Sequence, residues 1–339
     1  MALPTGVAGV FAPVNIAGVL LNKTDTRVPL FNMLGGSTIA SREFLVGAEY
    51  ELAAAGDAAI SEDASVTAPT PSYDTPTQAK NVTEIHHKAV RATYRKMSNT
   101  DALTGLHLAG QSNNVQNPLA FAIANRSAEM RNDFEWALLN QTYNLATTSA
   151  EVDKTRGLNA AITSNTVAAA SAELGWDMLM TLAKAMTATS PYGLEGVRGV
   201  LNGEQVVQLQ KMVTEQGIKI SPSLAGANLY DVQTPFGNLT FLQGGHRMQP
   251  NGTAGFYRLG SCKNVFEPVP GLGAIFYEKL SKTGATEHGQ IYAQWGLDHG
   301  HEWLHGKITG LATTTTATTA PKVFITNDAS NPVSTDEVS

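Results

Sequence analysis

A segment near the C-terminal end of the chain, His301 to His305, reads His-Glu-Trp-Leu-His and matches the HExxH pattern. On a helix this pattern puts two imidazoles on one face, where they hold a zinc ion beside a glutamate that acts as general base. Here glycines surround the motif, and the run that contains it, Gln290 to Leu311, is predicted to be strand. On a strand the two imidazoles would lie about 13 Å apart, too far to bind one ion. We therefore expect neither a catalytic residue nor a metal ligand here, and a zinc protease stays open as an alternative.

The other short motifs do not assemble into a catalytic or binding site. Asn22 to Asp25 matches the NKxD element with which GTPases read guanine, but the chain has no GxxxxGK[ST] phosphate loop upstream of it or elsewhere. A nucleophile elbow is also missing from the sequence. His86 and His87 are adjacent, so on a strand they point to opposite faces and cannot share a metal ion. We expect no cofactor.

The composition excludes several classes of protein. With 339 residues and 42% apolar content, the chain can bury a substantial core, and its length predicts more than one domain. The net charge of −6 gives no basic surface for nucleic acid, so any association with DNA is expected to be containment without sequence reading. The single Cys262 excludes an internal disulfide framework and is expected to be a small buried residue. Neither a signal peptide nor a membrane-spanning window is apparent, so we expect a cytosolic protein without a membrane partner.

The clearest structural signal is a long helix from Asn117 to Ala146. Asn117 is a good N-cap, and Pro118 suits the first helical position. Arg131 and Glu135 have the i, i+4 spacing of a surface ion pair. A helix of this length would run about 43 Å and would brace a flat or elongated body. Its apolar stripe predicts the core residues Leu119, Ile123, Met130, Phe134 and Leu138.

A protruding two-stranded ribbon is predicted ahead of this helix. Glu43 to Leu52 alternates as a strand does, and Asn81 to Lys96 forms a second run that is polar or charged on both faces. The small, acidic, proline-containing stretch from Ala53 to Lys80 suits the tip between them. An isolated ribbon is marginally stable in water, so either a partner surface covers it or it is an ordinary surface hairpin. The candidate inter-subunit contacts are Glu49, Glu51, Glu84, Lys88, Arg91, Arg95 and Lys96.

The rest of the chain predicts a mixed α+β module and a tail. Residues before Arg42 have no sustained period and are interpreted as an extended arm. After the long helix come helices near Leu174–Ala188 and Glu204–Thr214, together with several short strands. The strands are predicted at Val197–Leu201, Leu229–Gln233, Leu239–Leu242, Phe256–Leu259, Asn264–Phe266 and Ala274–Tyr277. From Ala312 the chain is rich in threonine.

This order of elements resembles the major capsid protein of tailed bacteriophages, which has the Hong Kong 97-type fold. Local matches support the resemblance along about residues 24 to 311. In chain order they are Thr26 to Leu30 with Leu34-Gly35 for the arm, Arg42 to Phe44 with Asn81 to Ile85 for the extended loop, Asn132 to Leu139 for the spine helix, and Leu280 to Gly284 with Gln290 to Leu311 for the returning strands.

The resemblance implies an α+β fold with an N-terminal arm, an extended hairpin loop (E-loop), a spine helix, a peripheral domain and an axial domain. The expected boundaries are 1–42 for the arm, 43–98 for the E-loop, 99–172 and 266–312 for the peripheral domain with its spine helix at 117–146, 173–265 for the axial domain, and 313–339 for the tail.

The implied function is structural, and no enzymatic activity is expected. Copies would self-assemble into hexamers and pentamers of an icosahedral virion shell around double-stranded DNA, built in the cytoplasm of a host bacterium. Portal protein and separate scaffolding or decoration proteins are the further partners implied. A phage tail or surface adhesion protein, suggested by the threonine-rich end, is a second alternative.

Overall fold

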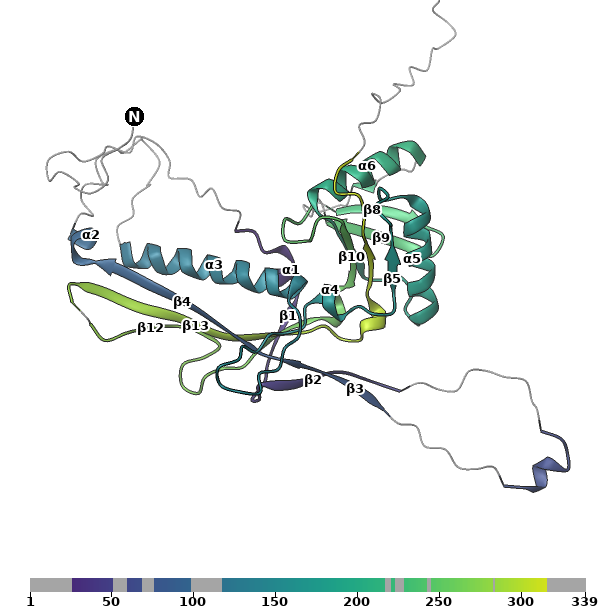
Figure 1. Cartoon of the computed structure of the whole chain (residues 1–339), viewed down its shortest axis with the longest axis horizontal. Helices are drawn as coiled ribbons and strands as arrows, with labels where there is room; N and C mark the ends of the chain where they lie inside the picture. Colours follow the sequence, from purple (N-terminus) through teal and green to yellow (C-terminus); the bar gives the residue numbers. More distant parts are fainter. Residues whose placement is uncertain are drawn as a thin grey trace, which may run out of the picture.

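The computed structural model of the chain describes residues 26–50, 60–68, 76–98, 118–216, 221–222, 229–242, 245–282 and 284–315. They form an elongated α+β body from which a narrow ribbon projects (Figure 1). The NKxD match, Glu51, Asn117 and the tail beyond residue 315 lie outside the described residues. None of the described helices combines the length and the apolar character that crossing a membrane requires.

A mixed sheet forms the elongated half of the body. Its longest strand, β13 (Thr286–Asp298), pairs antiparallel with β4 (Glu84–Thr93), β12 (Ile275–Lys279) and β11 (Lys263–Phe266). β1 (Gly35–Thr38) then pairs parallel with β11. Strands β1 and β4 from the N-terminal third of the chain therefore meet β11, β12 and β13 from its C-terminal third in one sheet.

The long helix α3 (Pro118–Asn140) packs on this sheet against β4 and β13 (Figure 1). Met130, Phe134 and Leu138 are buried, while Leu119 and Ile123 are partly buried against the same core. Phe134 lies at the centre, with its ring centroid 5.3 Å from that of Trp295 on β13 and 5.5 Å from that of Phe31. The apolar stripe of the helix thus faces the sheet.

The helix ends at Asn140, so the prediction that it continues to Ala146 is wrong. The amide of Gln141 still donates to the carbonyl of Ala137, but the carbonyl of Gln141 accepts from the amide of Gly157 at 2.8 Å. The amide of Gly157 therefore occupies the carbonyl of Gln141, which would have bonded the amide four residues later if the helix had continued. The helix stops where the chain folds back on itself.

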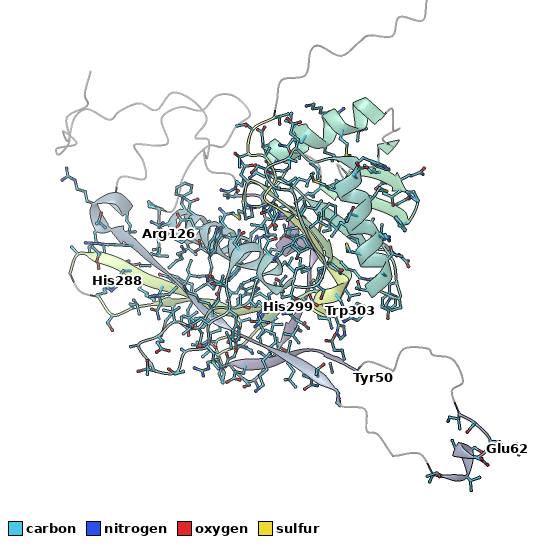
Figure 2. The ribbon with its side chains drawn as sticks, turned by 45° about the vertical axis from the view of Figure 1, so that its right-hand side comes forward. Tyr50, Glu62, Arg126, His288, His299 and Trp303 are labelled. Atoms are coloured by element: carbon cyan, nitrogen blue, oxygen red, sulfur yellow. The ribbon has the colours of Figure 1, made fainter. Side chains whose placement is uncertain are left out.

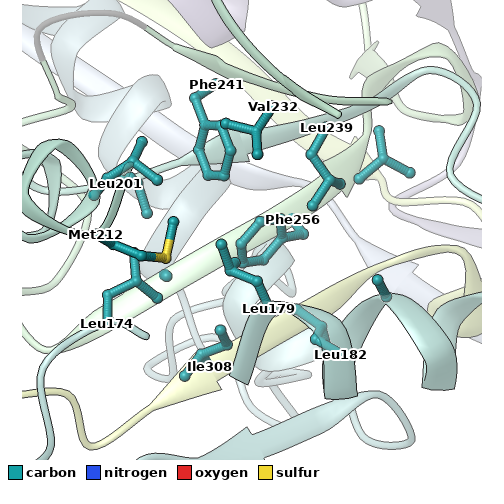
Figure 3. Packing of buried hydrophobic residues seen from close by; sticks show 14 of the residues in the cluster. Leu174, Leu179, Leu182, Leu201, Met212, Val232, Leu239, Phe241, Phe256 and Ile308 are labelled. Atoms are coloured by element: carbon teal, nitrogen blue, oxygen red, sulfur yellow. The ribbon is translucent and has the colours of Figure 1, made fainter. Parts of the chain in front are cut away.

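A second module contains a seven-stranded sheet in the order β5-β14-β10-β6-β9-β8-β7. Helices α5 (Trp176–Thr189) and α6 (Gly203–Gln216) pack against it around a leucine- and phenylalanine-rich core (Figure 3). The predicted helices and strands of this region are confirmed to within a few residues. The strands are β5 (Thr166–Ala168), β6 (Val197–Val200), β7 (Ser221–Pro222), β8 (Leu229–Thr234), β9 (Gly237–Leu242), β10 (Thr253–Arg258) and β14 (Gly306–Thr309).

The arm is not simply extended where the structure describes it. A short helix α1 (Pro29–Met33) and the strand β1 follow each other there and dock on the body. Leu30 is 1% exposed and joins the core beneath α3. The remaining short elements are α2 (Tyr94–Ser98), α4 (Leu158–Ala161), and the 3-10 turns η1 (Ala64–Val66), η3 (Leu259–Ser261) and η4 (Glu302–Leu304).

The ribbon consists of β2 (Glu43–Glu49) and β3 (Thr77–Val82), which pair antiparallel with each other (Figure 1). The prediction that Asn81 to Lys96 is the returning strand of the ribbon is therefore wrong. After Val82 the chain enters the body as β4, whose Val90 and Ala92 are buried. Small apolar residues alternate there with longer polar ones. Because of the charged side chains, the sequence of this half-buried strand looks like that of a solvated one.

Two glycines that precede helices give a prediction about packing. Gly157 and Gly175 are the N-cap residues of α4 and α5, and both have extended backbone that any residue can adopt. A Cβ on Gly157 would lie 2.7 Å from the carbonyl oxygen of Ala137, whereas one on Gly175 would have its nearest neighbour at 3.9 Å. We expect Gly157→Ala to lower the free energy of unfolding by about 2 kcal/mol, because the end of α3 must shift.

The matched control is Gly175→Ala, which we expect to change the free energy of unfolding by less than about 0.5 kcal/mol. The loss of a glycine N-cap is common to both variants, so the difference between them reports the space at Gly157 alone. Urea unfolding of the unassembled subunit, followed by circular dichroism, measures both values. Equal stabilities would contradict the close approach of the Gly157 loop to α3.

Candidate functional site: the ribbon and its anchor

The ribbon exposes apolar side chains along its length. Leu45 on β2 is 55% exposed, Tyr50 just beyond it is 66% exposed, and Val66 in the tip turn η1 is 86% exposed. Figure 2 shows the tip residue Glu62 well away from the body, and Tyr50 nearer to it, at the end of the paired strands. Exposed apolar side chains on a narrow pair of strands, just beyond it and in the turn η1 are a surface suited to contact with another protein.

The root of the ribbon, in contrast, is held firmly by Asn81. This buried side chain uses both of its polar atoms. Its Nδ2 donates to the carbonyls of Leu297 at 2.7 Å and Arg156 at 3.3 Å, and its Oδ1 accepts from the amides of Arg156 and Val82. A buried amide with every bond satisfied fixes one geometry, because any displacement leaves a polar group unpaired. The ribbon is thus anchored to β13 and to the loop that follows α3.

The HExxH segment follows β13, and the predicted strand does not continue through it. β13 ends at Asp298, Glu302–Leu304 forms the 3-10 turn η4, and β14 begins at Gly306. A single short turn does not bring His301 and His305 to one face as a zinc-binding helix does. Gly300, just before the motif, has a φ of +66°, a conformation that glycine adopts without strain and that turns the chain out of the strand.

Each polar residue of the motif has a structural role. The Glu302 carboxylate accepts from the amides of Thr163 and Ser164, at 2.9 and 3.1 Å, and from the Ser164 hydroxyl. Partial burial opposes ionisation, but these hydrogen bonds outweigh it and lower the pKa of Glu302. His305 is buried, with its Nδ1 accepting from the amide of Arg258 and its Nε2 donating to the carbonyl of His299. Within the described residues, no group of three or more His, Cys, Asp or Glu side chains is arranged to hold a metal ion.

Two of the predicted inter-subunit contacts are instead made within the subunit. Glu84 is buried, and its carboxylate bonds His86 at 2.7 Å and accepts from Gln141 and from the amide of Thr155. Lys88 pairs with Asp133 on α3. The sequence assigned these two side chains to a neighbour because it placed their strand in the ribbon, whereas β4 belongs to the body.

The other predicted contacts lie nearer the surface. Arg91 is exposed on β4, where it lies opposite His288, and Arg95 is exposed on α2. His87 is exposed and His86 is partly buried against Phe134, so these neighbours do point to opposite faces. Glu49, on β2, reaches η4 of its own subunit. The side chain of Lys96 lies outside the described part of the chain.

A buried carboxylate that joins three parts of the chain was missed by the sequence reasoning. Its spacing predicted that Glu135 pairs with Arg131 on the surface. Instead, Glu135 is 0% exposed. Its Oε2 accepts from the amide of Phe31 at 2.7 Å, and its Oε1 accepts from the amide of Leu30 at 2.9 Å and bonds His246 Nε2 at 2.7 Å. α1, α3 and the loop after β9 therefore meet at one side chain. No local pattern marks this role, because all three partners are more than a hundred residues away.

Cys262 is buried, as predicted, and its neighbourhood is apolar and histidine-rich. Burial raises the pKa of its thiol to about 12. Its Sγ lies 3.9 Å from Nε2 of His305 and 3.7 Å from the carbonyl of His299. A thiol held protonated in this way is a packing residue rather than a nucleophile.

A spine helix on a mixed sheet, a second α+β module and an anchored, projecting ribbon together define the class of protein: a shell subunit with the Hong Kong 97-type capsid fold. Solved structures share this fold. The SrpI encapsulin of Synechococcus elongatus PCC 7942 matches with a TM-score of 0.58 at 13% identity, over 88% of this chain and 95% of that one. The cyanophage A-1(L) capsid matches with a TM-score of 0.58 at 12% identity, over 88% and 96%. The capsid of the native GTA particle matches with a TM-score of 0.55 at 14% identity, over 92% and 96%.

The chain belongs to the SU10 major capsid protein family, whose model matches residues 3–312. It is therefore a structural protein of the capsid, and neither the family nor the fold supports a zinc protease. No curated protein sequence matches the chain.

Proposed function

We propose that copies of this chain form the hexamers and pentamers of a closed icosahedral shell around double-stranded DNA, and that the ribbon of each copy lies across the next. The shell is assembled in the cytoplasm of a host bacterium, with portal protein and separate scaffolding or decoration proteins as further partners. The sheet under α3 acts as the peripheral domain, and the seven-stranded module acts as the axial domain. The exposed ribbon is the observation that carries this proposal.

The energetics of the ribbon favour an occupant from another subunit. Two strands without a covering layer are marginally stable in water, and here the exposed side chains include Leu45, Tyr50, Ile60 and Val66. Full burial of one such side chain contributes about 1.5 to 3 kcal/mol. A neighbouring copy that covers several of these side chains stabilises the ribbon. The same contact holds the neighbouring copy in place in the shell.

Charge favours the opposite end of a neighbouring body as the receiving surface. Glu62 and Asp63 are exposed at the tip, and residues 51–79 contain several acidic residues but neither lysine nor arginine. The far end of the elongated sheet exposes Arg91 together with Lys279 and Lys282, two lysines that share the single carboxylate of Glu287. Arg91 thus remains a candidate contact, now on the body of the receiving copy.

The test is to image particles formed by the expressed protein and by a tip variant, Ile60→Asp with Val66→Asp. Both side chains are exposed, so the variant should keep the stability of the subunit, while the yield of closed shells should fall at least about tenfold because charge is buried at the contact. Val66→Thr, which keeps the shape of the side chain and adds no charge, is the control. Soluble monomers of the wild type under every condition would contradict the proposed function, and unchanged yield from the tip variant would contradict the ribbon contact.

A further inference from the structure

The ribbon touches its own body at a second point, beyond the root. The indole Nε1 of Trp303, in η4, donates to the carboxylate of Glu49 at 2.6 Å, and Nδ1 of His301 lies 3.4 Å from the same oxygen. His301 and Trp303 stack, with ring centroids 5.2 Å apart and an interplanar angle of 26°. Figure 2 shows Trp303 on the body close to where the ribbon departs. Two partly buried side chains of the HExxH segment therefore contact the ribbon.

The backbone of β2 is shaped to fit this contact. The register of β2 with β3 shifts between Val46 and Ala48, which leaves Gly47 as a bulge with a φ of +50°. A Cβ on Gly47 would lie 2.8 Å from Nδ1 of His301. The bulge thus needs glycine for its conformation and also for the approach of the imidazole.

The two contacts do different things to the ribbon. Asn81 fixes the root, near the pairing of Glu43 with Val82, whereas Glu49 is the last residue of β2. Asn81 lies four residues from Thr77, the partner of Glu49 on β3, so the contacts are separated by about 13 Å at the usual rise of a strand. One fixed point sets where a strand leaves the body, and a second point along it sets the direction.

We propose that Gly47, Glu49, His301 and Trp303 form a clamp that sets the angle at which the ribbon leaves its subunit, and with it the curvature of the shell. This inference rests on the proposed function, because the angle matters only if the ribbon reaches a neighbouring copy. All four are positioning residues, and the HExxH match is explained by this role and by the packing of Glu302 and His305.

Trp303→Phe tests the hydrogen bond of the clamp. The variant keeps an aromatic ring against His301 but lacks the donor to Glu49. We expect amide exchange in β2 and β3 of the unassembled subunit to rise about tenfold, with exchange in the body unchanged. The distribution of particle diameters should broaden. Trp136→Phe, at an exposed tryptophan on α3, is the matched control and should change neither measurement.

Gly47→Ala tests the fit of the bulge against the imidazole. Gly193 has a similar φ of +56° but nothing within 4 Å of an added Cβ, so Gly193→Ala reports backbone strain without the clash. We expect Gly47→Ala to raise ribbon exchange well beyond any effect of Gly193→Ala. Adding His301→Ala to Gly47→Ala should then lower exchange again, because the clashing ring is gone.

These measurements separate the clamp from the proposed function. The clamp would be overturned if the ribbon amides of Trp303→Phe exchanged as slowly as those of the wild type. It would also be overturned if they exchanged faster but the distribution of particle diameters did not change. Failure of His301→Ala to lower the exchange of Gly47→Ala would also count against it. Absence of shells from the wild type would contradict the proposed function, while exchange in the unassembled subunit would still decide whether the clamp holds the ribbon.

Discussion

Replacing Glu135 with glutamine should lower the free energy of unfolding by about 3 kcal/mol. The carboxylate accepts from two backbone amides, those of Leu30 and Phe31, and bonds His246 in a site without access to water. Glutamine has the same shape but replaces one acceptor oxygen with a donor. At least one of the three partners then faces a donor, and a buried polar group without its bond carries the full cost of desolvation.

The control for Glu135→Gln is Glu129→Gln, nearly two turns earlier on the same helix. Glu129 pairs with Arg126 on the surface, where both side chains are more than 40% exposed, so its loss should cost less than about 0.5 kcal/mol. Urea unfolding of the unassembled subunit compares the two variants, and amide exchange should show α1 released first in Glu135→Gln. Equal stability of the two variants would show that the junction of α1, α3 and His246 does not depend on the carboxylate.

Local signals predicted the elements of the fold well. The start of α3 follows from Pro118, and its buried stripe follows from the spacing of Met130, Phe134 and Leu138. The helices and strands of the second module also lie close to their predicted positions, because each has its own period and turn residues. The family resemblance, which combined such signals in order, supplied the capsid fold.

Partners that are distant in the sequence explain what local signals could not predict. Glu135 lies off the apolar stripe of α3, yet α1 and His246 cover it from outside the helix. β4 resembles a solvated strand because Glu84 and Lys88 lie on the same face as the buried Val90. Only the contacts with α3 and with the loop after it show that these charges are satisfied within the subunit. The role of the HExxH segment could not be predicted from its own residues, because its side chains bond the ribbon and the Ser164 loop.

Acid should destabilise the subunit before its carboxylates are protonated, through His299 and His305. Burial is the main cause that lowers the pKa of each imidazole to about 4, and for His299 the charges of His305 and Arg156 add to it. The unfolded chain binds a proton on each near pH 6.5, so stability is full above that pH, falls as the pH drops towards 4, and then levels off. Each histidine should contribute about 3 kcal/mol to this loss.

His299→Phe should reduce the acid loss by about half, because it removes one of the two titrations. Neither ring nitrogen of His299 has a well-aligned hydrogen-bond partner among the described residues, so phenylalanine should cost less than about 1 kcal/mol at neutral pH. His87→Gln, at an exposed histidine on β4, is the control and should leave the acid loss unchanged. The measurement is the free energy of unfolding between about pH 7.5 and pH 4.5, since unperturbed carboxylates are protonated mainly below that interval. If His299→Phe lost as much stability in acid as the wild type does, His299 would not be the buried neutral base that its surroundings require.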